Sequence, residues 1–86
     1  MPFQKKASLK VYGITYEQFV EMYYKQDKKC AICNKEIDIN SRFTHIDHCH
    51  KTGKVRGLLC HQCNAGIGFL NDDINILANA IKYLTQ

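Results

Sequence analysis

Cys30-Ala31-Ile32-Cys33 and Cys60-His61-Gln62-Cys63-Asn64 share one cysteine spacing, and between them lies His45-Ile46-Asp47-His48-Cys49-His50. Each C-x-x-C pair presents two thiols on one turn of chain, so two pairs supply the four ligands of a tetrahedral zinc site. The gap between the pairs exceeds the roughly 15–20 residues usual for a zinc ribbon. A longer loop costs little, because closure entropy grows only logarithmically. We expect a structural zinc on Cys30, Cys33, Cys60 and Cys63, whose four thiolates leave no open position for water.

Two alternatives use the same residues. A disulfide framework of a small secreted protein is disfavoured, because the chain has five cysteines and its first ten residues lack the apolar core of an export signal. A zinc site built on Cys33, His48 and His50 would leave Cys60 and Cys63 without a metal. Retained thiols without an export signal indicate a reducing, cytoplasmic environment.

Length and composition explain why a metal is needed. A chain of 86 residues has room for one domain, which we place at residues 1–86 with 1–9 flexible. The core of so small a domain often needs a metal or a disulfide to be stable. The hydrophobic content of 45% is ordinary for a globular chain. No apolar run approaches the ~20 residues of a membrane span. The net charge of +4 suits a polyanion such as nucleic acid but is weak evidence alone.

The local patterns predict an α+β fold. A helix is expected over residues 15–27, where Thr15 and Gln18 form a capping-box pair. Strands are expected over 43–48 and 55–59, with a turn at 52–54, followed by a helix from Cys60 that carries Cys63 and Asn64. Residues 71–73 are expected to cap a last helix that folds back over the core. The apolar face of that helix comprises Ile74, Leu77, Ala78, Ile81 and Leu84.

The segment between the cysteine pairs has the residues that phosphodiester hydrolysis requires. That reaction needs a nucleophilic water, a base and a cation that neutralises charge on the phosphate and the leaving oxygen. His48 can be the base, and Asp47 and Asn64 can be oxygen ligands of Mg²⁺ or Mn²⁺. Neighbouring strand residues point to opposite faces, so the strand must bulge or end near Asp47 for Asp47 and His48 to face one phosphate. The alternative is that the histidines are further zinc ligands or solvated surface.

A family resemblance rests on a longer motif. Asp47-His48-x-His50, then Thr52-Gly53-x-Val55-Arg56-Gly57-Leu58-Leu59-Cys60-x-x-Cys63-Asn64, resembles the phage recombination endonuclease VII family, part of the HNH or ββα-metal group of nucleases. Tyr12-Gly13-Ile14-Thr15 and the helix after it resemble the leader of that family, so the similarity covers roughly residues 10–71.

The resemblance implies a fold and a set of roles. The fold would be a small zinc-stapled ββα-metal domain with flanking N- and C-terminal helices. The zinc would lie on the four cysteines, the catalytic divalent ion on Asp47 and Asn64, and the general base would be His48. His45 and His50 would position phosphate or the base, and Arg56 would touch the DNA backbone or remain solvated.

Two departures from the family pattern limit these roles. Cys49 stands where a carboxylate often follows the Asp-His pair, and we expect it to be a small buried side chain without a role. The junction-resolving member is longer, with a helical C-terminal part that builds a dimer, whereas here about 20 residues follow Asn64.

The function expected from the sequence is a metal-dependent DNA endonuclease that nicks duplex DNA, without a small-molecule cofactor or a membrane partner. It would act as a monomer or weak homodimer. The alternatives are a dimeric resolvase of branched DNA and a non-catalytic zinc module that binds nucleic acid or protein.

Overall fold

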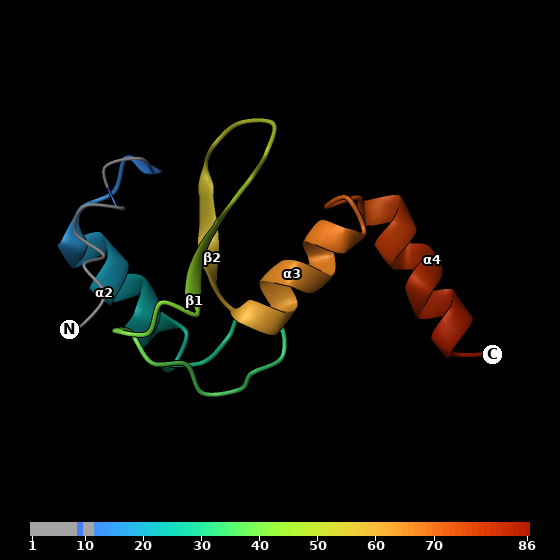
Figure 1. The fold of residues 1–86 in the computed structure, drawn as a ribbon, viewed down its shortest axis with the longest axis horizontal. Coiled ribbons are helices and arrows are strands. Elements are labelled where there is room, and N and C mark those ends of the chain that lie inside the picture. Colours follow the sequence, from blue (N-terminus) through green and yellow to red (C-terminus); the bar gives the residue numbers. More distant parts are fainter. Residues whose placement is uncertain (1–8, 10–11) are drawn as a thin grey trace.

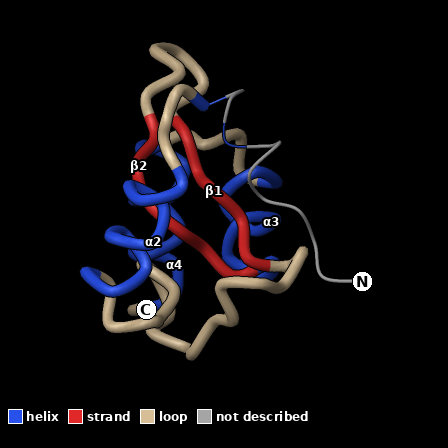
Figure 2. Tube along the Cα trace, turned by 90° about the vertical axis from the view of Figure 1, so that its left-hand side faces the viewer, coloured by secondary structure: helices blue, strands red, loops and turns tan. Residues whose placement is uncertain are grey.

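The fold is α+β, as expected, in a computed structural model that describes residues 9 and 12–86. In chain order it has α2 (Tyr16–Lys25), β1 (Thr44–His48), β2 (Val55–Cys60), α3 (His61–Phe69) and α4 (Ile74–Leu84). The two strands form one antiparallel hairpin. Helix α2 lies on one side of the hairpin and α3 on the other (Figures 1 and 2). Among the described residues, no helix is long and apolar enough to cross a bilayer.

The hairpin has an irregularity at the place where the sequence required one. Asp47 pairs with Gly57 but the next residue, His48, pairs with Val55, so Arg56 is an extra residue in β2. A β-bulge of this kind bends the strand and re-aims its side chains. The turn that joins the strands includes Gly53 at a φ of +77°, a left-handed conformation that glycine adopts without strain. A bulge therefore lies beside Asp47 and His48, but its extra residue is in β2 and not in β1, the strand for which we expected it.

Helix α2 begins at the predicted capping box. The Gln18 amide donates to the Thr15 hydroxyl, and the Gln18 side chain accepts from the Thr15 amide. The helix ends two residues earlier than expected, since Asp27 has a φ of +56° and leaves the helical conformation. Just past this end, the Gln26 carboxamide donates to the Leu58 carbonyl and accepts from the Leu58 amide. Gln26 thereby ties the end of α2 to β2.

The core lies between the hairpin, α2 and the first cysteine loop. Its buried members are Leu9, Phe19, Cys30, Ile37, Ile46, Leu58, Leu59 and Cys60. Leu9, the last residue of the segment 1–9 that we expected to be flexible, is only 2% exposed. The rest of that expectation, residues 1–8, lies outside the described residues.

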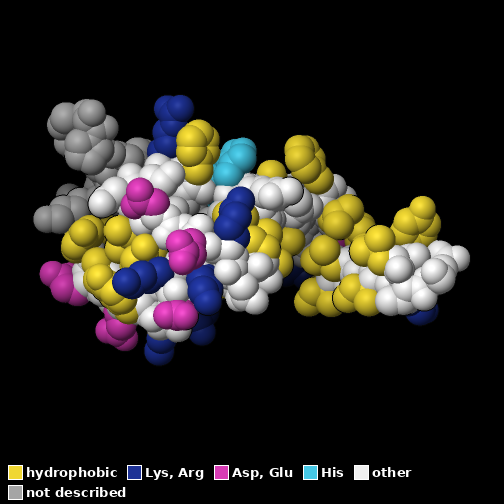
Figure 3. All heavy atoms as spheres, turned by 90° about the horizontal axis from the view of Figure 1, so that it is seen from below, with side chains coloured by type: hydrophobic (Ala, Val, Ile, Leu, Met, Phe, Trp, Pro, Cys, Tyr) yellow, Lys and Arg dark blue, Asp and Glu magenta, His cyan; other side chains and the backbone are white. Residues whose placement is uncertain are grey.

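Helix α4 corrects a second expectation. It projects away from the hairpin and α3 (Figure 1), and all of its residues are described yet none is buried. Ile74 is 81% exposed and Leu84 79%, and hydrophobic side chains gather over this end of the molecule (Figure 3). The physical reason lies in the connection, where Asn71 and Asp72 both have left-handed φ values, +60° and +53°. These residues direct the chain away from the core, so the helix does not fold back.

Candidate zinc centre and active site

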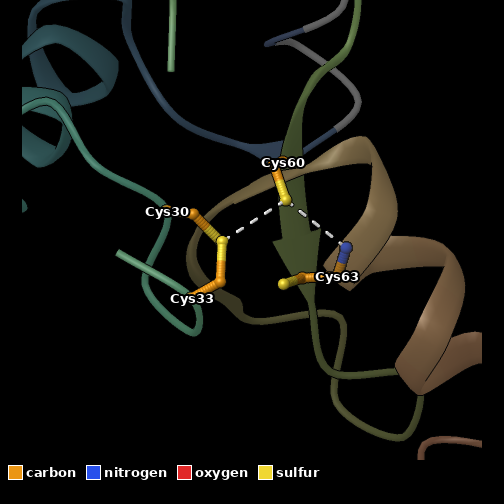
Figure 4. Close-up of side chains that lie close together, drawn as sticks. All are labelled: Cys30, Cys33, Cys60 and Cys63. Carbon is orange, nitrogen blue, oxygen red and sulfur yellow. Dashed lines mark hydrogen bonds between the residues drawn. The ribbon is translucent and has the colours of Figure 1, made fainter. Parts of the chain in front are cut away.

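Four thiols converge where the hairpin ends and α3 begins. The sulfur atoms of Cys30, Cys33, Cys60 and Cys63 all lie within 4.8 Å of one another (Figure 4), and none is in a disulfide. The Sγ atoms of Cys33 and Cys60 are 3.8 Å apart. A tetrahedral zinc with Zn–S bonds of about 2.3 Å places its ligand sulfurs about 3.8 Å apart. The cluster therefore fits a closed structural zinc, and a site on Cys33, His48 and His50 is not what the chain forms.

Local backbone geometry holds each cysteine pair. In the first loop the Asn34 amide donates to the Cys30 carbonyl, and Asn34 has a φ of +63° that closes the turn. The Ile32 amide donates to the Cys30 sulfur. In the second pair Cys60 is the N-cap of α3, and its sulfur accepts from the Cys63 amide. Both turns are thus held by hydrogen bonds within the chain itself.

The thiols differ in their protonation. Burial raises the pKa of Cys30, but backbone N–H groups of Cys33, Cys60 and Ile32 outweigh it and lower the value to about 6. Burial and hydrogen bonds with the other thiols raise the pKa of Cys63 to about 12. Of these two thiols, Cys30 therefore gives up its proton more readily than Cys63. Zinc, which binds thiolates, must displace the proton of Cys63.

At the other end of β1, Asp47 is held by an arginine. The Nε atom of Arg56 donates to Oδ2 of Asp47 at 2.7 Å, and Nη2 donates to Oδ1 at 3.0 Å. The same guanidinium donates to both oxygens of Asp72, at 3.2 and 2.9 Å. Arg56 is thus paired with two carboxylates while 38% of its side chain stays exposed, and neither carboxylate partner was anticipated from the sequence. Asp72 is a residue that the sequence analysis missed as part of the site.

The imidazoles of His48 and His50 lie beside this cluster. Their ring centroids are 5.0 Å apart, and the His48 ring is 5.3 Å from that of Tyr12. Arg56 lowers the pKa of Asp72, and the charges of His50 and His48 act in the same direction. His50 also lines an open hollow of about 260 Å³ with Asp72. The end of β1 opposite the bulge therefore gathers both histidines and Asp72, with Asp47 linked through Arg56.

Asn64 is half-buried on the first turn of α3. His61, Asn64 and Gly68 share one face of that helix, since positions three, four and seven apart align. At one end of this face His61 contacts His45 of β1, and at the other Gly68 lines the hollow that includes His50. Asn64 therefore lies on α3 between a residue that contacts β1 and a residue that lines the hollow beside His50.

His45 lies apart from the other two histidines. Its Nε2 atom is 3.0 Å from Nδ1 of His61, and the two rings are 5.2 Å apart. This pair lies beside Cys60, the residue that precedes His61. The structure thus gives His45, two residues before Asp47 in β1, a partner that the sequence analysis did not name.

Cys49 differs from its expectation. It is half-exposed rather than buried, and hydrogen bonds from Thr52 lower the pKa of its thiol. It lies outside the four-cysteine cluster. The turn after β1 explains its exposure, since the Cys49 amide donates to the Lys54 carbonyl within the hairpin loop.

Comparisons with known proteins give the family. A sequence profile described as recombination endonuclease VII matches residues 5–86. The Gene 59 protein of Mycobacterium phage D29 is 46% identical over 79 residues, which are 91% of this chain and 47% of that protein. The Gene 59 protein of Mycobacterium phage L5 is 42% identical over 77 residues, 88% of this chain and 46% of that protein. The chain spans about half the length of these relatives. From the extent of the profile match, this chain belongs to the recombination endonuclease VII family.

Proposed function

We propose that this chain is a DNA endonuclease that hydrolyses phosphodiester bonds with one divalent cation and His48 as general base, within a single domain over residues 1–86. Membership of the recombination endonuclease VII family supports the coarser part, a nuclease whose partner is DNA. The observation that carries the finer part is the bulge beside Asp47. That end of β1 carries Asp47, and the His48 and His50 imidazoles lie close enough to the neighbouring Asp72 for their charges to act on it, which supports the assignment.

The proposed roles follow from side-chain chemistry. His48 takes a proton from the attacking water, because an imidazole gains and loses protons near neutral pH. Asp47 and Asn64 offer the oxygen ligands that Mg²⁺ or Mn²⁺ prefers. A cation bound there would neutralise charge on the phosphate and the leaving oxygen. His50, beside the open hollow, would position the phosphate. His45, paired with His61, would have the same positioning role nearer the opposite end of β1.

The four-cysteine centre supports this site from the other side. Cys60 ends β2 and caps α3, while Cys63 directly precedes Asn64. A zinc on these thiols would fix the first turn of α3 against the hairpin, and so fix the backbone from which Asn64 projects. The proposed zinc is therefore structural, and its catalytic contribution is indirect.

Supercoiled plasmid, incubated with the zinc-loaded chain with and without Mg²⁺ or Mn²⁺, tests the proposal. We expect open circles in the presence of either ion and none in EDTA. Cys49→Ala is the matched control, because Cys49 adjoins His48 yet has no proposed role. Cleavage by the parent chain that is unchanged in EDTA would refute the metal dependence. Absence of cleavage with bound DNA would support a non-catalytic zinc module instead.

A second candidate function is a resolvase that cuts two strands as a dimer. We expected a monomer because α4 was thought to cover its own core, and the exposed apolar face of α4 removes that reason. Two symmetric cuts require two sites related by a two-fold axis. Light scattering at micromolar concentration with a plasmid time course separates the candidates. A monomer that gives open circles before linear DNA supports nicking; a tight dimer that gives linear DNA directly supports the resolvase.

A further inference from the structure

The contacts of Arg56 occupy the carboxylate that the proposed function assigns to a metal. Nε and Nη2 of Arg56 engage both oxygens of Asp47, and Nη1 and Nη2 engage both oxygens of Asp72. The two carboxylates are well covered, with 12% of the Asp47 side chain and 19% of the Asp72 side chain exposed. We call this three-residue arrangement the Arg56 clamp.

The bulge creates the clamp. In a regular ladder Arg56 would point to the face opposite Gly57 and therefore away from Asp47, which pairs with Gly57. Because Arg56 is the extra residue of β2, its side chain reaches the face that Asp47 occupies. The same three residues line a hollow of about 270 Å³ together with apolar side chains such as Ile67 and Leu77. Apolar surroundings strengthen the attraction between the guanidinium and the carboxylates.

A guanidinium and a divalent cation compete at such a carboxylate. A bidentate arginine takes one lone pair on each oxygen, and its positive charge repels a second cation at contact distance. We propose that Arg56 is a positioning residue that locks Asp47 in the absence of a divalent cation and moves wholly onto Asp72 when the cation binds. The inference rests on the proposed function, because it takes Asp47 as a ligand of that cation.

Asp72 is suited to hold the released arginine. It already accepts two hydrogen bonds from Nη1 and Nη2, so Arg56 can release Asp47 while keeping a charged partner. Asp72 projects from the connection between α3 and α4 and lines the open hollow with His50. Arg56 held by Asp72 would remain at the edge of the site, on the side where His50 lies.

Mn²⁺ binding to the zinc-loaded chain, measured by electron paramagnetic resonance, tests the lock without any cleavage assay. Arg56→Gln removes the competing charge, so we expect the dissociation constant for Mn²⁺ to fall by on the order of tenfold or more, the size of effect that a close charge pair commonly has. Arg56→Lys keeps the positive charge but loses the bidentate geometry of the guanidinium. Its dissociation constant for Mn²⁺ should therefore lie between those of the parent and of Arg56→Gln. Arg42→Gln is the matched control, because Arg42 lies over the Phe43 ring and carries the same charge.

The sign of the change decides between two roles of Arg56. If Arg56→Gln weakens Mn²⁺ binding while zinc content and circular dichroism stay as in the parent, Arg56 supports the ligand rather than locking it, and the proposal is wrong. If Arg42→Gln tightens binding as much as Arg56→Gln, the effect is one of net charge and the lock is again refuted.

A double-mutant cycle separates the role of Asp72 from that of a metal ligand. Under the lock, Asp72→Asn weakens Mn²⁺ binding because Arg56 then stays on Asp47, and this effect shrinks greatly in the Arg56→Gln background. An equal loss in both backgrounds would make Asp72 a ligand and overturn its assigned role.

Asp47→Asn separates the lock from the proposed metal site. If Mn²⁺ binding is unchanged in this variant, Asp47 is not the ligand, and the metal assignment fails together with the lock. If it abolishes binding while Arg56→Gln has no effect, the lock alone fails.

Discussion

Cys60→Ala is expected to unfold the chain. Cys60 combines three roles, as a member of the four-thiol cluster, as the N-cap of α3 and as a buried core residue that is 5% exposed. Zinc contributes roughly 10–16 kcal/mol of apparent binding energy in small structural sites. Even half of that, about 5–8 kcal/mol, matches the roughly 5–15 kcal/mol by which domains are stable.

The measurement is thermal unfolding by far-ultraviolet circular dichroism, with zinc per chain determined by elemental analysis. Cys49→Ala is the matched control, since Cys49 is a half-exposed thiol outside the cluster, and it should keep one zinc per chain and the parent melting temperature. The reasoning is refuted if Cys60→Ala melts like the parent, or if Cys49→Ala loses the metal.

Three further predictions address the base, the last helix and the thiols. His48→Ala should reduce plasmid cleavage by on the order of 10²–10⁴-fold with zinc content unchanged, the usual worth of a positioned base; cleavage at the parent rate would place the base elsewhere. Ile81→Asp, at a side chain 65% exposed, should change the free energy of unfolding by less than about 0.5 kcal/mol. Leu58→Ala, at a side chain 0% exposed, should lower it by about 2–5 kcal/mol; equal effects in urea titrations would contradict the exposure of α4. Zinc uptake at pH 7 should release protons, but fewer than four, because the pKa of Cys30 is lowered to about 6 while that of Cys63 is raised to about 12. Protons compete for Cys30 only as the pH falls below about 6, so zinc affinity should fall more steeply with pH below that value than above it. Calorimetry in buffers of different ionisation enthalpy counts the protons released at pH 7, and four or none would refute this assignment.

Much of the fold was predictable because its signals are local. The capping box at Thr15 and Gln18 starts α2 in the structure as it does in the sequence. The turn around Gly53 and the two cysteine pairs are also short-range patterns, and each forms where the sequence places it. These features depend on backbone conformation within a few residues, so no knowledge of the packing around them is needed.

The position of α4 was not predictable for a physical reason. Its pattern of apolar residues shows that the helix has a hydrophobic face, and its cap at Asp73 shows where it begins. Neither property says what covers that face. The direction of the helix depends on the left-handed φ values of Asn71 and Asp72, which asparagine and aspartate tolerate but do not require.

The candidate site was predictable in its residue types but not in its contacts. Asp47, His48 and Asn64 follow from chemistry and motif, and the need for a bulge follows from strand alternation. Which strand takes the extra residue does not follow, because either an insertion in β1 or one in β2 would satisfy that need. The structure places it at Arg56, and this choice alone brings the guanidinium to the face of Asp47. The charge beside the candidate metal ligand is therefore set by hairpin register, so a substitution that restored a regular ladder would separate Arg56 from Asp47 without changing either residue.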